Sequence, residues 1–136
     1  MEVLSNIPFT IDFEALSARV RVDPQREEAA DLQALVAQVQ PIARPKAVYD
    51  LCFIEAREAD TVQLNGVAFH SRVLSVNLQE VHRAFPYVAT CGTELYHVDV
   101  EGDPLKEYWL DQIRMLAVGH AAGYVKEHVE RTYQPG

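Results

Sequence analysis

The sequence predicts one domain of the α+β class, in which a mixed or antiparallel sheet packs against a long C-terminal helix and shorter helices. Three segments lead to this prediction. Residues 103–133 read as one long helix, residues 61–69 as a β-hairpin, and residues 85–89 as a buried strand. A chain of 136 residues is long enough for one hydrophobic core, so residues 1–136 are assigned to a single domain.

The composition is that of an ordinary globular protein, with 49% hydrophobic and 24% charged residues. The net charge of −8 disfavours non-specific binding to nucleic acid or to anionic membranes, because their phosphate groups would be repelled. The sequence also lacks an apolar run near the roughly 18 residues of a membrane span. We therefore expect a cytoplasmic protein, in which Cys52 and Cys91 stay reduced.

The N-terminal third is expected to contain one edge strand and two helices. Ile7 to Ile11 read as an edge strand, because Pro8 has no N–H for a sheet ladder. Asp12 is placed to cap a short helix over residues 13–19, and residues 20–22 then run extended.

Asp23 and Pro24 predict the start of the second helix, which ends before Pro41. Pro41 and Pro45 then bracket a connector in which Arg44 is either a ligand clamp or a solvated loop residue. The second helix carries one apolar stripe, formed by Ala29, Leu32, Leu35, Val36 and Val39.

The middle of the chain reads as a strand, a hairpin and a helix. Residues 47–56 are the strand, and Asn65-Gly66 is typical of a tight hairpin turn between two short strands. Ser71 is expected to cap a helix that runs to Val81.

Phe85 to Ala89 form a continuous apolar run, which is typical of a strand covered on both faces. The polar turn that follows brings a thiol, two hydroxyls and a carboxylate to a strand end, where open sheets bind ligands. The alternative is a strand that simply stops at a turn. The candidate ligand-binding or partner-binding residues are Thr90, Cys91, Gly92, Thr93, Glu94 and His97.

After a helical turn to His97, Asp103 is expected to cap a helix to Tyr133 that spans about 45 Å. Gly119 and Gly123 cost this helix roughly 2 kcal/mol against alanine, which predicts close packing or a kink there. One face of the helix is traced by Leu105, Trp109, Ile113, Leu116, His120 and Tyr124.

The sequence contains no signature of a catalytic or metal site, so catalytic residues stay unassigned. The five histidines form no His-x-x-x-His pair and the two cysteines no Cys-x-x-Cys pair, so no metal site is expected. Cys91 is either a nucleophile, activated by a histidine such as His97, or an inert buried thiol. Glycine-rich phosphate-binding motifs are absent.

Two segments carry a family resemblance. Phe85–Leu95, followed by Asp103–Asp111, resembles the small stand-alone relatives of the activation domain of cobalamin-dependent methionine synthase. Pro41–Ala47 and Ser71–Leu74 resemble the same group, so the resemblance covers nearly the whole chain. It implies an α+β fold and a role beside a corrinoid cofactor.

The activation domain binds S-adenosylmethionine and presents it to the corrinoid, so that oxidised cobalt can be reduced and remethylated. The resemblance therefore implies an accessory protein of corrinoid-dependent methyl transfer, with a corrinoid protein as partner and cobalamin reached only through that partner. The family's Arg-x-x-x-Gly-Tyr-Pro ligand motif lies where this chain stops, at Tyr133–Gly136, so no residue is assigned to S-adenosylmethionine. Val118 replaces the aspartate of the Asp-x-His-x-x-Gly motif of corrinoid carriers, so the chain is not expected to be one.

Three hypotheses remain open at this point. The chain is an accessory protein that docks onto a corrinoid protein near Thr90 to Glu94, or an enzyme that uses S-adenosylmethionine. The third possibility is a structural module that keeps the fold and forms homo-oligomers through the long C-terminal helix.

Overall fold

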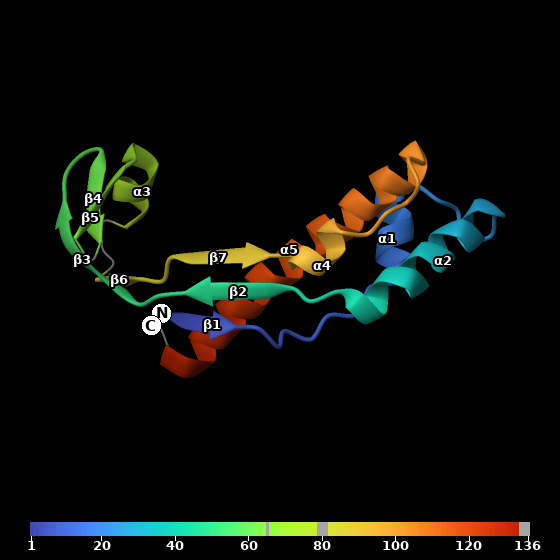
Figure 1. Ribbon diagram of the computed structural model, residues 1–136. Coiled ribbons are helices and arrows are strands. Elements are labelled where there is room, and N and C mark those ends of the chain that lie inside the picture. Colours follow the sequence, from blue (N-terminus) through green and yellow to red (C-terminus); the bar gives the residue numbers. More distant parts are fainter. Residues whose placement is uncertain (65, 79–81, 134–136) are drawn as a thin grey trace. The chain divides into compact units, whose positions relative to one another are not determined.

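The computed structural model describes residues 1–64, 66–78 and 82–133, and the chain divides into two compact units. Unit 1 comprises Met1–Glu2 and Val48–Tyr87, and unit 2 comprises Val3–Ala47 and Val88–Gly136. The chain enters unit 1 along β2 (Lys46–Tyr49) and leaves it along β7 (Tyr87–Thr90) (Figure 1). Helices and antiparallel sheet confirm the predicted α+β class.

Unit 1 contains a four-stranded antiparallel sheet of strand order β5-β4-β3-β6. The predicted hairpin is confirmed, because Leu64 of β4 pairs with Val67 of β5 and Gly66 has a φ of +80°. Asn65 lies outside the described residues. The strands are β3 (Cys52–Arg57), β4 (Thr61–Leu64), β5 (Val67–His70) and β6 (Arg83–Ala84).

A short helix, α3 (Arg72–Asn77), follows the hairpin, and Ser71 caps it as predicted, accepting a hydrogen bond from the Leu74 N–H at 3.1 Å. The helix is followed by a C-cap at Leu78, and the predicted end at Val81 lies outside the described residues. The core of the unit consists of Cys52, Val62 and Leu64, with Ile54, Leu74, Leu78 and Ala84 packed against it.

The strand predicted over residues 47–56 is in fact two strands, β2 and β3. Asp50 and Leu51 interrupt it, because the Asp50 carboxylate accepts a hydrogen bond from the Leu51 N–H at 3.0 Å. The Asp50 N–H donates to the Pro86 carbonyl oxygen at 3.0 Å. A polar side chain that bonds its own backbone can end a strand locally.

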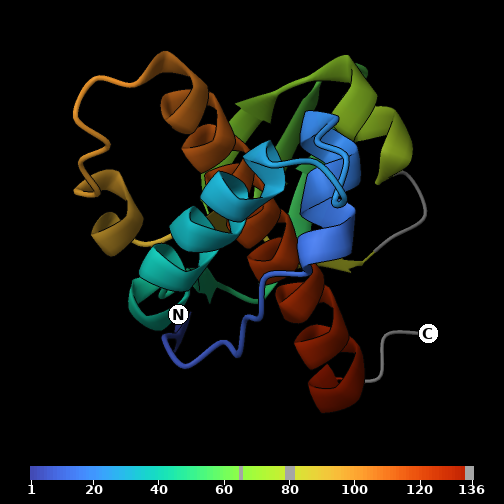
Figure 2. The same ribbon diagram turned by 90° about the vertical axis from the view of Figure 1, so that its right-hand side faces the viewer.

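In unit 2, three helices pack together, because α1 (Phe13–Val20) and α2 (Glu28–Val39) both contact α5 (Pro104–Tyr133) (Figure 2). The remaining elements of this unit are η1 (Gln40–Ile42) and α4 (Thr93–Tyr96). The strands β1 (Glu2–Leu4), β2 and β7 form a three-stranded sheet of order β1-β2-β7, and each of them has residues in both units. The largest fully buried side chain is Trp109. The core cluster also includes Leu16, Leu32, Leu35, Val39, Cys91, Leu95, Leu110 and Ile113.

The predicted edge strand at Ile7 to Ile11 is wrong, because the only strand in this region is β1, and residues 5–12 form no regular element. The side-chain amide of Gln40 makes the backbone hydrogen bonds that a neighbouring strand would make. Gln40 accepts a hydrogen bond from the Ile11 N–H at 2.7 Å and donates to the Phe9 carbonyl oxygen at 2.8 Å.

The predicted cap of α1 is confirmed, because Asp12 accepts a hydrogen bond from the Ala15 N–H at 3.2 Å. Residues 20–22 do not run extended as predicted. Arg21 adopts a left-handed conformation with a φ of +59°, which lets the Val22 N–H bond to the Ser17 carbonyl oxygen and close the helix.

The second helix begins at Glu28 rather than at Pro24, although it ends before Pro41 as predicted. Asp23 bonds locally instead of capping a helix. Its carboxylate accepts from the Gln25 N–H at 2.9 Å, and its carbonyl oxygen accepts from the Arg26 N–H at 3.0 Å. Asp-Pro therefore builds a turn before the helix here.

The bounds of α5 are confirmed, but its predicted apolar face is only partly right. Trp109 and Ile113 are buried, whereas Leu105 and His120 are exposed. Six of the seven buried residues, all except Leu110, are spaced four apart, so the buried face shifts gradually around a helix of 3.6 residues per turn. They are Trp109, Leu110, Ile113, Ala117, Ala121, Val125 and Val129.

Close packing at Gly119 and Gly123 is not found, because a Cβ built on either glycine would have no atom within 4 Å. The two glycines lie on the outer side of α5, away from the core of unit 2.

The strand predicted over residues 85–89 is not buried. The strand β7 begins at Tyr87 and lies at the edge of the three-stranded sheet, where Tyr87 is 52% and Val88 is 66% exposed. An edge strand has a neighbour on one side only, so a continuous apolar run does not guarantee burial. Among the described residues, no helix has the length and apolar character to cross a membrane.

Candidate functional site

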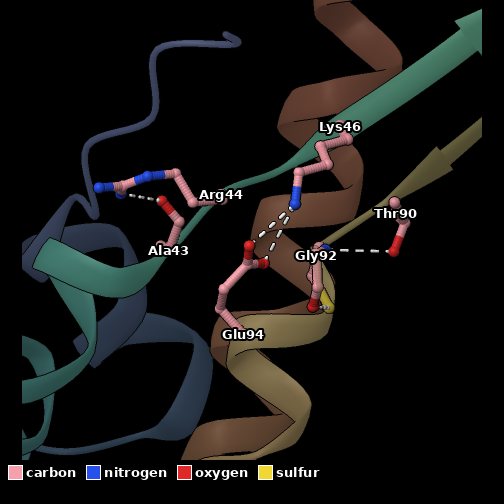
Figure 3. Close-up of polar contacts among 7 residues, drawn as sticks. Ala43, Arg44, Lys46, Thr90, Gly92 and Glu94 are labelled. Atoms are coloured by element: carbon pink, nitrogen blue, oxygen red, sulfur yellow. Dashed lines mark hydrogen bonds and ion pairs between the residues drawn. The ribbon is translucent and has the colours of Figure 1, made fainter. Parts of the chain in front are cut away.

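The predicted polar turn lies in unit 2, between β7 and α4, and Gly92 fixes its shape. Gly92 has φ +92° and ψ 149°, a backbone conformation that is almost restricted to glycine. Its N–H donates to Thr90 Oγ1 at 3.1 Å (Figure 3). A Cβ at Gly92 would lie 2.3 Å from the Arg44 carbonyl oxygen, so the connector before β2 passes directly against the turn.

An ion pair joins the same two segments. Lys46 Nζ lies 2.9 Å from Glu94 Oε1 and 3.2 Å from Oε2 (Figure 3), and both side chains are partly exposed. The hydrogen bond from Lys46 lowers the pKa of Glu94 below its ordinary value. Sequence reasoning missed Lys46, because no local pattern pairs two residues that are 48 positions apart.

Arg44 does not reach into the turn as a ligand clamp. Its side chain is exposed, and its guanidinium donates to the Ala43 carbonyl oxygen at 2.8 Å (Figure 3). The part of Arg44 that contacts the turn is its backbone carbonyl, which lies beside Gly92.

Cys91 is buried rather than poised for reaction. Its side chain is 1% exposed, and burial raises the pKa of the thiol, although the charge of Arg114 partly opposes this effect. His97 is exposed at the C-terminal end of α4, and in the part of the chain that the structure describes the Cys91 thiol bonds the Gly92 carbonyl oxygen rather than His97. A neutral, buried thiol is a poor nucleophile.

A shallow groove of about 380 Å³ lies beside the turn, between α4 and α5. Arg114 organises it, because its Nε and Nη2 donate to the Leu95 carbonyl oxygen at 3.2 and 2.9 Å while Nη1 binds Asp111 at 2.8 Å. The guanidinium also lies over the Tyr96 ring, 5.1 Å from its centre. The groove is lined by Cys91, Tyr96, Tyr108, Asp111, Gln112, Arg114, Met115 and Val118.

The cation in the groove lining is Arg114, and its guanidinium is already bonded to the Leu95 carbonyl oxygen and to Asp111, so it is not free to bind the carboxylate of a ligand such as S-adenosylmethionine. No group of three or more histidine, cysteine, aspartate or glutamate residues suited to a metal ion occurs among residues 1–64, 66–78 and 82–133.

Three stretches distant in sequence converge at this site. Pro41–Ala47 contributes Arg44 and Lys46, and Phe85–Leu95 contributes Gly92 and Glu94. Asp103–Asp111 contributes Trp109 and Leu110, which share one core cluster with Cys91 and Leu95. Of the candidate residues, Thr90, Cys91, Gly92 and Glu94 are brought together, whereas Thr93 and His97 are exposed on α4 and at its end.

Comparison of the chain with protein-family models, with curated proteins and with solved structures found no match. We refer below to Thr90–Glu94 and the groove lining together as the turn–groove surface.

Proposed function

We propose that this chain is an accessory protein of corrinoid-dependent methyl transfer, which docks onto a corrinoid protein through the turn–groove surface. The observation that carries the proposal is that Pro41–Ala47, Asp103–Asp111 and the part of Phe85–Leu95 from Val88 onward converge in unit 2. These are three of the four stretches that resemble the methionine synthase activation domain; the fourth, Ser71–Leu74, lies in unit 1. Cobalamin is reached through the partner protein, and no residue of this chain ligates it.

The chemistry of the turn–groove surface suits docking better than catalysis. Tyrosine, methionine and arginine are enriched at protein interfaces, and the groove presents exposed Tyr96, Tyr108 and Met115 around the anchored Arg114. The thiol of Cys91 is buried, and Glu94 is held by Lys46. A rigid turn beside exposed aromatic side chains provides a preformed contact surface.

The experiment is capture of a corrinoid protein on the immobilised chain from an extract of cells that encode it. We expect the captured protein to show the absorbance spectrum of bound corrinoid. Replacing both Tyr96 and Tyr108 with alanine should reduce capture at least tenfold, because exposed aromatic residues often dominate binding energy. A Val73→Ala variant is the matched control, since Val73 is an exposed apolar residue of unit 1.

The proposal is wrong if no corrinoid is captured, or if the tyrosine variant captures as much as the control. A calorimetric titration with S-adenosylmethionine, with S-adenosylhomocysteine for comparison, separates the enzyme hypothesis from docking. We expect no saturable heat at about 1 mM ligand, a concentration that detects even weak binding. Saturable heat that is lost in Glu94→Ala would favour the enzyme instead.

A second candidate function is a structural module that forms homo-oligomers. The observation that favours it is the exposed outer side of α5, which carries Tyr108, Met115 and Val118. An exposed apolar surface on a helix commonly marks a site of association.

A further inference from the structure

The outer side of α5 carries a stripe of six residues whose spacing is the same in both directions. The intervals along it are four, three, one, three and four, so the stripe stays on one side of the helix. We call these residues the outer stripe: Asp111, Met115, Val118, Gly119, Ala122 and Lys126.

The outer stripe is accessible in the described structure. Met115 is 53% and Val118 is 36% exposed, and a Cβ on Gly119 would have no atom within 4 Å. The Asp111 side chain is 63% exposed, and Lys126 is exposed. Arg19 of α1 contacts one edge of the stripe, where its Nη2 lies 3.9 Å from the Met115 Sδ, and Ala122 is partly buried, but Met115 and Val118 keep these exposed fractions.

The outer stripe is complementary to the same stripe of a second copy that runs antiparallel to it. If the two α5 helices cross at the point between residues 118 and 119 of each copy, Asp111 of one copy faces Lys126 of the other, and Met115 faces Ala122. Val118 and Gly119 meet at the centre. Each acidic residue then faces a basic one, and each larger apolar residue faces a small one. Glycine and alanine allow the two helices to approach closely over this centre.

We propose that the chain forms a homodimer in which two α5 helices pack antiparallel along the outer stripe, around a two-fold axis between Val118 and Gly119. Each Asp111 pairs with Lys126 of the second copy, so two charge pairs flank the apolar centre and oppose the general repulsion between copies of net charge −8. An unrelated partner would not require a stripe that reads the same in both directions.

The contact is expected to be modest. Residues 111–126 span about 24 Å of helix, so the buried area lies at the low end for specific interfaces and a dissociation constant in the micromolar range is expected. This inference does not rest on docking to a corrinoid protein; it gives the second candidate function, homo-oligomerisation, a defined contact. Because Asp111, Met115 and Val118 also line the groove, dimerisation and docking of another protein would compete. The tests therefore use the chain alone.

The first test is charge reversal, measured by sedimentation equilibrium up to about 1 mM chain. We expect Lys126→Asp and Asp111→Lys to weaken the dimer at least tenfold each, because each creates two like-charge pairs. The double variant should regain most of the lost affinity. The proposal is overturned if the wild-type chain stays monomeric, or if the double variant is no better than the single ones.

If Asp111→Lys fails to fold, Lys126→Asp alone still shows whether reversing one charge of the pair weakens the dimer. Asp111 binds Arg114, whereas Lys126 has no ion pair among the described residues. Circular dichroism verifies that each variant keeps its helix content.

The second test is disulfide cross-linking, which reports the orientation of the helices. Val118→Cys places a thiol at the axis, whereas Glu130→Cys places it about 35 Å from its symmetry mate. We expect the Val118→Cys variant to form a disulfide-linked dimer under mild oxidation and the Glu130→Cys variant not to. Both variants also carry Cys91→Ala, because Cys91 lines the same groove as Val118 and could form a disulfide within one chain; Cys52 is buried. Cross-linking of both variants, or of neither, would contradict the antiparallel dimer.

Discussion

Gly92 is the residue on which the shape of the candidate site depends. Its backbone conformation is almost restricted to glycine, and the Arg44 carbonyl oxygen occupies the place where a side chain would begin. A substitution here must move either the turn or the connector before β2. The same contact places Lys46 opposite Glu94.

We predict that Gly92→Ala lowers the free energy of unfolding by about 2–4 kcal/mol, because backbone strain and a clash with backbone atoms add together. Urea denaturation measures the change. Gly102→Ala is the matched control, since Gly102 has a φ of +73° but no atom within 4 Å of its Cβ position. It should cost about 1–2 kcal/mol from strain alone. Equal losses in both variants would show that the contact with Arg44 contributes nothing.

Glu94 should make stability depend on pH. The hydrogen bond from Lys46 lowers the pKa of Glu94 in the folded chain below its ordinary value. The contribution of its charge is therefore fully present above the unfolded pKa and is lost as pH falls through the folded pKa. We expect the wild-type chain to be more stable than Glu94→Gln at pH 7.

This difference should shrink toward zero as pH falls below about 4, the region where a free glutamate titrates. Thermal unfolding at a series of pH values measures it. Lys46→Met is the control, in which the Glu94→Gln substitution should have a smaller effect that depends less on pH, because only the backbone hydrogen bond and the charge of Arg44 still lower the pKa of Glu94. A wild-type advantage that does not change with pH would exclude the ion pair as its source.

At this scale the sequence predicts the turn residues but not their partners. Thr90 to Glu94 stand out as a polar run after an apolar one, and the structure places them at a strand end. Lys46 and Arg114 could not be found this way, because their partners Glu94 and Leu95 lie far away in sequence. Such contacts follow from tertiary packing alone.

Secondary-structure elements were predictable where their signal is local and long. The bounds of α5 follow from the capping Asp103, Pro104 and a helix without further proline, and the Asn-Gly turn locates the hairpin. The errors concern features that depend on neighbouring segments. Burial of β7 depends on which strands flank it, and the segment Ile7 to Ile11 is held by a side chain from η1.

Gln40 should therefore stabilise the N-terminal segment as a neighbouring strand would. Its amide satisfies the Ile11 N–H and the Phe9 carbonyl oxygen together. We predict that Gln40→Ala costs about 1–3 kcal/mol, because both backbone groups lose their partner. The Ile11 amide should also exchange with solvent faster, which hydrogen exchange by NMR would detect.

Gln38→Ala is the matched control, since Gln38 is exposed on α2 and its loss should change stability by less than about 0.5 kcal/mol. Unchanged exchange at Ile11 in Gln40→Ala would mean that the segment is held by other contacts. Such contacts include the one between His120 and the Pro8 carbonyl oxygen.

At the scale of the whole molecule, the division into two units was not predicted. The sequence has no glycine-rich or proline-rich linker, and the chain passes between the units along strands β2 and β7. Hydrophobic patterning indicates that a core exists, but it does not show that unit 1 has a small cluster of its own around Val62. The two clusters become distinct only when the contacts are known.

We predict that unit 1 unfolds locally while unit 2 stays folded. Val62 is fully buried in the core of unit 1, so Val62→Ala should cost about 2–3 kcal/mol of the stability of that unit. Trp109, the only tryptophan of the chain, lies in the core of unit 2 and reports on that unit by its fluorescence. Hydrogen exchange should accelerate in residues 48–87, while the unfolding midpoint seen by Trp109 stays unchanged.

Ile113→Ala is the matched control, because Ile113 is fully buried in the core cluster of unit 2. It should lower the midpoint reported by Trp109 directly. If Val62→Ala shifts the Trp109 midpoint as much as Ile113→Ala does, the two units unfold as one cooperative structure. If only exchange in residues 48–87 responds, unit 1 is a separate unit of local unfolding, and the turn–groove surface stays formed when it opens.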